Sequence, residues 1–194
     1  NAAMENGKSY LLKSGSSYLS AETDKTSADY GKLVYGSLNT SDLNEVVAGT
    51  WKVSTKTTSG AVVYTFVNKV TGMTLAVDPT LAKTATNGLS GDVTLGSGTV
   101  SEWAFDASNH MYSYFKSDSI VFFDNTGALN KGKIADLSAA LAVTEDVIST
   151  PIPISADDLN TLMWSVDSKD NYFALNMDPE VSKGKANHLT ATGL

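Results

Sequence analysis

Short runs of aromatic and β-branched residues alternate along this chain with turns that contain Gly, Ser or Asn. The first pair of runs covers residues 9–12 and 18–21, and Gly15 and Ser16 lie at the reversal between them. Enrichment of this kind on both sides of a Gly- and Ser-containing reversal is typical of a β-hairpin. The pattern therefore predicts that the chain opens with two antiparallel strands.

A larger pattern centres on Trp51, Trp103 and Trp164, each of which begins a strand-like run. The first two are each followed by an aromatic run, a turn and a further apolar run: residues 64–68 and 74–77 after the first, and residues 112–115 and 120–123 after the second. A shape that recurs at such intervals indicates internal repetition. We expect the three tryptophans to occupy equivalent core positions.

Counting strands leads to a fold prediction. If the run at Trp164 completes the first round, three four-stranded lobes result, which is the arithmetic of an all-β, β-trefoil-like domain with short helical turns. One such turn is predicted at residues 41–45, with Ser41 as its N-cap. The domain would span residues 1–170, and residues 171–194 would form a C-terminal hairpin that packs on it or leads to a following domain. The alternative is a two-sheet β-sandwich built from the same strands.

Composition narrows the range of partners. The chain has 194 residues, of which 42% are apolar, and a net charge of −7. Its 14 basic residues are all Lys, so the bidentate contacts that Arg makes with phosphate are missing. An acidic surface also repels nucleic acid. We expect no nucleic-acid partner and, because no apolar stretch approaches about 18 residues, no transmembrane segment.

The chain contains no Cys and is rich in Ser, Thr, Asn and Gly. This composition favours an exported bacterial protein that does without disulfides. Residues 1–4 (Asn-Ala-Ala-Met) show neither the basic start nor the apolar run of a signal peptide. The predicted location is extracellular or on the outer cell surface, with the signal peptide absent from this chain.

The segment at residues 64–75, Tyr-Thr-Phe-Val-Asn-Lys-Val-Thr-Gly-Met-Thr-Leu, resembles the second and third strands of ricin-B-like trefoil repeats. Those repeats place a Gln two residues before the Trp. Here Gly49, Ser101 and Leu162 stand at that position, and the chain has no Gln. The Asp, aromatic and Asn residues with which such lectins hold a sugar have no match either. The resemblance therefore concerns the fold and implies no sugar site.

Most of the chain is similar to the N-terminal regions of uncharacterised secreted proteins of gut Bacteroidetes. The segments that carry this likeness are residues 9–21, 51–79, 102–103 and 156–160. The likeness implies export and residence at the cell surface, with no activity assigned. Some members look like surface-layer proteins, whose acidic, Lys-based and Cys-free composition this chain shares.

The residues capable of catalysis are scattered. His110 and His188 lie far apart, each beside an Asn in a turn-like setting, without the close spacing of a metal site. The sequence shows neither a Gly-x-Ser-x-Gly elbow nor a Gly-rich phosphate loop ending in Gly-Lys-Ser/Thr. We interpret both histidines as surface residues.

The acidic residues lead to the same interpretation. Asp157 and Asp158 fit the N-terminus of a short predicted helix. Asp167, Asp170 and Asn171 offer oxygen ligands that suit Ca²⁺, yet their spacing differs from an EF-hand loop. The six Glu residues form no close carboxylate pair of the glycosidase type. The prediction names no catalytic, cofactor-binding or metal-binding residue.

Exposed aromatic side chains on β scaffolds often stack on sugar rings. If any aromatic residue of this chain does so, Tyr30, Tyr35 and Tyr112, which lie near loops, are better candidates than the tryptophans.

The leading functional prediction is a non-catalytic, exported cell-surface module with a structural or adhesive role, similar to a surface-layer component. Its partners would be other surface-protein copies or domains. The alternative is a carbohydrate-binding module of lectin type, whose partners are glycans, and a weaker third class is an accessory domain of a secreted hydrolase.

Overall fold

The computed structural model describes residues 4–84 and 93–147. These residues belong to the first of two compact units, Asn1–Pro151, and the second unit is Ile152–Leu194. Trp164 and the predicted hairpin at residues 171–194 lie outside the described residues.

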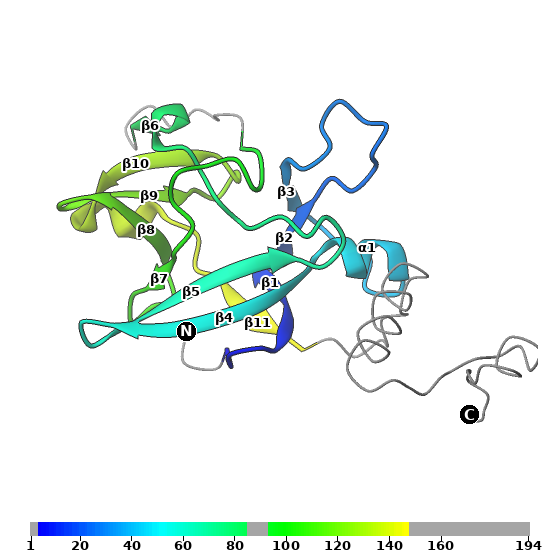
Figure 1. The fold of residues 1–194 in the computed structure, drawn as a ribbon, viewed down its shortest axis with the longest axis horizontal. Helices are drawn as coiled ribbons and strands as arrows, with labels where there is room; N and C mark the ends of the chain where they lie inside the picture. The colour runs from blue at the N-terminus through cyan, green and yellow to red at the C-terminus, as the bar shows by residue number, and fades with distance from the viewer. Residues whose placement is uncertain (1–3, 85–92, 148–194) are drawn as a thin grey trace, which may run out of the picture. The chain divides into compact units, whose positions relative to one another are not determined.

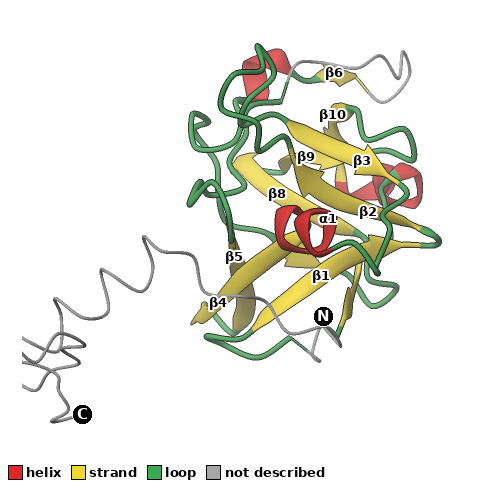
Figure 2. Ribbon diagram, turned by 90° about the vertical axis from the view of Figure 1, so that its right-hand side faces the viewer, coloured by secondary structure: helices red, strands yellow, loops and turns green. Residues whose placement is uncertain are grey.

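Strands are the main regular structure of the described chain, and the helices are single short turns (Figure 2). The all-β prediction is confirmed. The strands are β1 (Ser9–Ser14), β2 (Ser17–Ala21), β3 (Leu33–Gly36), β4 (Thr50–Thr58), β5 (Ala61–Asn68), β6 (Lys83–Thr84), β7 (Ala104–Phe105), β8 (Met111–Lys116), β9 (Ser119–Phe123), β10 (Leu129–Lys133) and β11 (Thr144–Asp146). The helical turns are α1 (Leu43–Ala48), η1 (Pro79–Leu81) and η2 (Ile134–Ala139). One sheet has the order β3-β2-β1-β4-β5, with β11 beside β1, and the other has the order β6-β10-β9-β8-β7.

The two sheets are joined by backbone pairing into a closed ring of six segments (Figure 1). β1 pairs with β4, and β4 pairs with β5 along its whole length. Tyr64 of β5 then pairs with Trp103, immediately before β7, and β7 pairs with β8. His110, just before β8, pairs with Ala142, just before β11, and β11 pairs with β1.

Three segments of the ring each begin a lobe, which we define as residues 9–58, 61–105 and 110–146. β1, β5 and β8 use one edge in the same way. The first residues of each strand, or the residue just before it, pair with the fourth segment of the same lobe, at β4, Trp103 and Ala142 in the three lobes. The last residues of each strand pair with the second segment, at β2, Thr74 and β9. This recurrence favours the β-trefoil interpretation over the β-sandwich, and the trefoil itself stays a prediction.

From the strand count, the run at Trp164 was predicted to complete the first round and so to lie beside β1. In the structure β11 takes this place, with Leu12 opposite Glu145. The other edge of β1 is shared by β4 and β2. Because both edges of β1 are occupied within the first unit, the closure of the ring needs no residue beyond Asp146.

The centre of the ring is built around two of the three tryptophans. The side chains of Trp51 and Trp103 are both fully buried. The indole N–H of Trp51 donates to the carbonyl oxygen of Leu19 at 2.9 Å, and that of Trp103 donates to the carbonyl oxygen of Leu75 at 2.9 Å. For these two residues the prediction of equivalent core positions is confirmed.

The third lobe has no tryptophan in this role. In the second lobe, the backbone N–H of Tyr64 donates to the carbonyl oxygen of Trp103 at 2.8 Å. In the third lobe, the backbone N–H of Met111 donates in the same way to the carbonyl oxygen of Leu141 at 3.1 Å. Leu141 is buried, so a smaller apolar residue fills the corresponding place. The sequence did not predict this position, because the expected repeat was defined by tryptophan.

The third lobe also has a second apolar cluster on the outer face of its sheet. Val121 and Phe123 of β9 point into the main core, whereas Ile120 and Phe122, on the opposite face, pack with Leu137 and Ala140 at η2. The sequence predicts a short helix or a strand at residues 134–143, and the first half of this segment is the 3₁₀ turn η2. The turn covers apolar side chains of the outer face of β9 that would otherwise be exposed.

One turn recurs after the second segment of every lobe. An Asp Oδ1 accepts hydrogen bonds from both the backbone N–H and the hydroxyl of the Thr two residues later, in the pairs Asp24–Thr26, Asp78–Thr80 and Asp124–Thr126. Such local bonds stabilise a chain reversal. The repeat is therefore marked by a polar turn as well as by apolar core positions.

The short helix α1 begins one residue later than expected. Its N-cap is Asp42 rather than Ser41, because the Asp42 carboxylate accepts the free backbone N–H of Asn44 at 2.9 Å. In the described part of the chain, no helix has the length and apolar character needed to cross a membrane.

Candidate functional site

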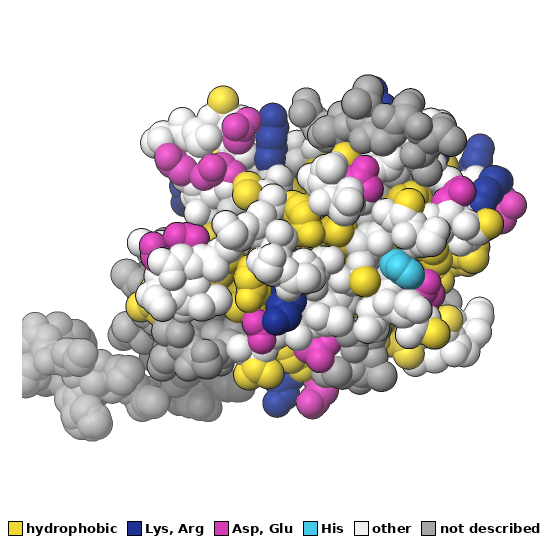
Figure 3. All heavy atoms as spheres, turned by 180° about the vertical axis from the view of Figure 1, so that it is seen from behind, with side chains coloured by type: hydrophobic (Ala, Val, Ile, Leu, Met, Phe, Trp, Pro, Cys, Tyr) yellow, Lys and Arg dark blue, Asp and Glu magenta, His cyan; other side chains and the backbone are white. Residues whose placement is uncertain are grey.

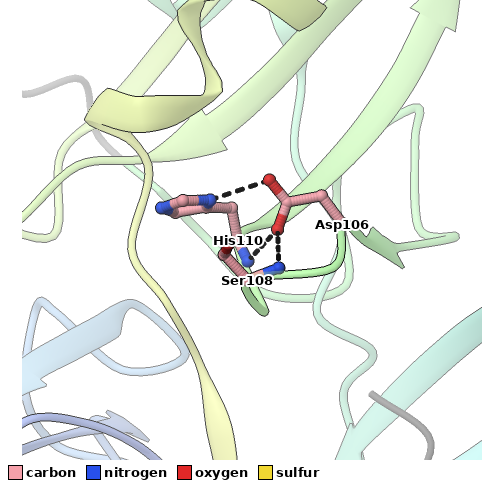
Figure 4. Close-up of polar contacts among 3 residues, drawn as sticks. All are labelled: Asp106, Ser108 and His110. Atoms are coloured by element: carbon pink, nitrogen blue, oxygen red, sulfur yellow. Dashed lines mark hydrogen bonds and ion pairs between the residues drawn. The ribbon is translucent and has the colours of Figure 1, made fainter.

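A single carboxylate organises the turn between β7 and β8. Asp106 Oδ1 accepts the backbone N–H of Ser108 at 2.9 Å and that of His110 at 2.8 Å. Its other oxygen, Oδ2, lies 2.8 Å from Nδ1 of the His110 ring (Figure 4). Asn109 adopts a left-handed backbone with φ of 66°, a conformation that Asn tolerates better than most residues. The turn thereby holds the imidazole ring in one orientation.

The electrostatics of this turn keep Asp106 ionised. Burial acts to raise the pKa of the carboxyl group, but the hydrogen bonds from the His110 side chain and from the backbone of His110 and Ser108 outweigh it. Together with the charge of His110, they lower the pKa of Asp106 below its usual value. Since the carboxylate accepts from Nδ1, a neutral His110 carries its proton there and leaves Nε2 as an acceptor.

Next to this turn, His110, Tyr112 and Tyr114 form what we call the β8 stripe. Side chains two residues apart in a strand lie on the same face, so these three share the outer face of the strand. Met111 and Ser113, which alternate with them, are buried. The rings of Tyr112 and Tyr114 meet edge to face, with their centroids 5.4 Å apart.

The members of the stripe are open to solvent to different degrees. Tyr114 is 50% exposed, whereas Tyr112 is half-buried against the second apolar cluster. Burial raises the pKa of Tyr112, and the charge and hydrogen bond of Tyr114 and the charge of Asp106 raise it further. The phenol of Tyr112 thus lies within electrostatic range of Tyr114 and of the Asp106 carboxylate. On the face of the molecule drawn in Figure 3, acidic and Lys side chains are scattered among polar and apolar ones.

Some of the residues singled out in the sequence lie in the described part of the chain. His110 directly follows the turn at residues 107–108 instead of lying in it, pairs with Ala142, and keeps 22% of its side chain exposed while Asp106 holds its ring. Among residues 4–84 and 93–147, no three His, Asp or Glu side chains come together in a way that could hold a metal ion. The other candidate residues lie outside the described part of the chain: His188, Asp157, Asp158, Asp167, Asp170 and Asn171.

The three tyrosines named from the sequence lie in different settings. Tyr30 is partly exposed in the loop between β2 and β3. Tyr35 packs on the main core, and a Cβ added to Gly127 would come within 2.7 Å of its Cβ, so a turn of the third lobe lies close against it. Tyr112 is the one that belongs to a larger polar and aromatic group.

Two members of that group, Asp106 and Tyr114, were not named from the sequence. The signal for Tyr114 was present, because the alternation Tyr112-Ser113-Tyr114 places both phenols on one face of a strand. The role of Asp106 depends on the conformation of the turn that follows it, and this conformation was not evident from residue types.

Compared with family models, curated proteins and solved structures, the chain has no match in any of the three comparisons.

Proposed function

We propose that the protein is a non-catalytic, exported module of the bacterial cell surface, with a structural or adhesive role in a larger assembly that resembles a surface layer. The observation that carries this proposal is that the carboxylates of the repeated turns form hydrogen bonds within those turns. Asp24, Asp78 and Asp124 are each hydrogen-bonded to a Thr in their own turn. Groups engaged in holding turns suit a scaffold better than a reaction centre.

Composition and resemblance support export. The absence of Cys and Arg, the net charge of −7 and the likeness of residues 9–21 and 51–79 to secreted Bacteroidetes proteins point in the same direction. The partners would then be other copies or domains of surface proteins. An acidic surface without Arg disfavours nucleic acid as a partner.

Fractionation of the native cells tests the location. The protein should be found at high copy number in the outer-surface fraction, and protease added to intact cells should remove it, while a cytoplasmic marker protein stays protected. Recovery of the protein with the cytoplasmic marker would overturn the proposal.

Assays with polysaccharides test the absence of catalysis. We expect prolonged incubation of the purified protein with bacterial and host polysaccharides to release no reducing ends. The variant Asp106→Ala provides the control, because any release that disappears in this variant would have to originate from this chain. Such release would identify an enzyme.

The second candidate function is a carbohydrate-binding module of lectin type. It is favoured by one observation, the 50% exposure of Tyr114 beside Tyr112 on the outer face of β8. Half-exposed aromatic rings are well suited to the apolar faces of sugars.

A further inference from the structure

We propose that the β8 stripe, together with the Asp106 carboxylate, is a binding subsite for a short run of pyranose rings in an uncharged glycan. The proposal rests on the second candidate function and specifies where such a module would bind and which class of glycan it would take. It lies on the first strand of the third lobe and uses residues outside the Trp-containing core.

The aromatic part of the subsite is preorganised. Tyr112 packs against the second apolar cluster, and its ring meets that of Tyr114 edge to face at an interplanar angle of 82°. Tyr114, which is half exposed, is therefore supported from one side and open on the other. A ring that is already fixed loses little conformational entropy when a sugar stacks on it.

The polar part of the subsite can bind neighbouring sugar hydroxyls. Three N–H groups occupy three of the roughly four lone-pair sites that a carboxylate offers, which leaves Asp106 able to accept one hydroxyl. The Nε2 atom of His110 points away from Asp106 (Figure 4). In the neutral ring this atom accepts a second hydroxyl, so the pair presents two acceptors whose positions the turn has set.

Charge selects among glycans. Asp106 keeps its negative charge because its pKa is lowered, and the chain as a whole carries −7. On the same sheet, Lys133 is paired with Asp118 at 3.0 Å and Lys131 lies over the ring of Phe115. A carboxylate-bearing sugar would meet repulsion at this place without an Arg to offset it. The subsite therefore favours neutral over acidic sugars.

The test begins with the full chain on an array that contains neutral and acidic oligosaccharides, followed by calorimetry with the neutral oligosaccharide that gives the strongest array signal. Tyr114→Ala should weaken binding about tenfold, while Tyr114→Phe, which keeps the ring, should stay within about threefold of the wild type. His110→Ala should weaken binding as well. Tyr30→Ala is the matched control, because it removes a partly exposed tyrosine away from the stripe, and it should leave affinity unchanged.

The possible results distinguish a failure of the lectin-type function from a failure of the proposed subsite. If the wild-type chain binds no glycan, both the lectin-type function and the subsite are wrong. If it binds a glycan and Tyr114→Ala, shown by circular dichroism to be folded, binds equally well, the function stands and the subsite is wrong. A loss of affinity in Tyr30→Ala, or a preference for acidic glycans, would also overturn the subsite proposal.

Discussion

The two lobes that contain a buried tryptophan and the third lobe fill their centres in different ways. Trp51 and Trp103 each contribute one large ring and one indole N–H, and each N–H is satisfied by a backbone carbonyl oxygen of a preceding Leu. The third lobe has Leu141 at the corresponding place and adds the outer cluster under η2. A lobe with a smaller central side chain thus buries additional apolar surface on its other face.

The Asp-containing turn of the third lobe also differs from those of the first two lobes. Asp24, which is exposed, and Asp78, which is partly exposed, each bond mainly to the Thr of their own turn. Asp124 also accepts the backbone N–H of Ala128 at 3.2 Å and the side-chain Nδ2 of Asn130 at 2.6 Å. The third lobe therefore depends more on a partly buried polar network. Its outer surface carries the β8 stripe.

The largest expected effect concerns the tryptophans. Trp51→Ala and Trp103→Ala should each lower the free energy of unfolding by about 3–5 kcal/mol, because each substitution leaves a large cavity in the main core. Unfolding in urea, followed by circular dichroism, measures this. A loss below about 1 kcal/mol in either variant would show that the two lobes are not built around these rings.

The outer cluster should contribute less. Leu137→Ala should lower the free energy of unfolding by about 2 kcal/mol, at the lower end of the range for buried Leu, because the outer cluster is small. Ile134→Ala is the matched control on the same turn, since Ile134 is 44% exposed and should lose much less. Equal losses in the two variants would contradict a cluster that depends on Leu137.

The polar network should produce a smaller difference between lobes. Asp124→Ala should cost about 1–3 kcal/mol, because the N–H of Ala128 loses its partner and the amide of Asn130 keeps only the carbonyl oxygen of Ala128. Asp24→Ala and Asp78→Ala remove the equivalent carboxylates from exposed turns and should cost clearly less. Denaturation midpoints of the three variants, measured side by side, decide this. Equal costs would mean that the three turns are equivalent after all.

The smallest expected effect is a dependence on acid. Burial acts to raise the pKa of Asp124, yet the hydrogen bonds from Thr126, Asn130 and Ala128 outweigh it and lower the pKa. A lowered pKa in the folded state stabilises the protein above the unfolded value of about 3.9, and this stabilisation is lost as the pH falls through the folded value. Denaturation midpoints from pH 7 down to pH 2 should therefore decline below about pH 4. The decline should be shallower in Asp124→Asn, and an identical decline would rule out this carboxyl as a contributor.

Much of the fold was predictable because the signals are local. The hairpin of β1 and β2, the strands β5, β8 and β9, and the burial of both rings follow from aromatic and β-branched runs punctuated by Gly and Ser. The run at residues 74–77 was expected to be a strand and forms only isolated bridges. The helix cap was wrong by one residue, since Ser41 and Asp42 are both good caps and only the observed bond to Asn44 distinguishes them.

The candidate site was predictable only in part. Tyr112 was named from its place near a loop, and its companion Tyr114 follows from the strand period. The link between Asp106 and His110 depends on a left-handed residue at Asn109 that bends four residues into contact. Residue types alone do not determine such a bend.

The sequence by itself determined the all-β class and the positions of most strands, because these depend on the order of side chains along a few residues. Only the tertiary structure decided which segment closes the ring. β11 and β1 are more than a hundred residues apart, and their pairing depends on backbone hydrogen bonds, which carry no side-chain signature. For the same reason Leu141 could take the place expected for a third tryptophan: a core position is defined by the space that surrounding strands leave, and a smaller apolar residue fills it when a second cluster buries the remainder.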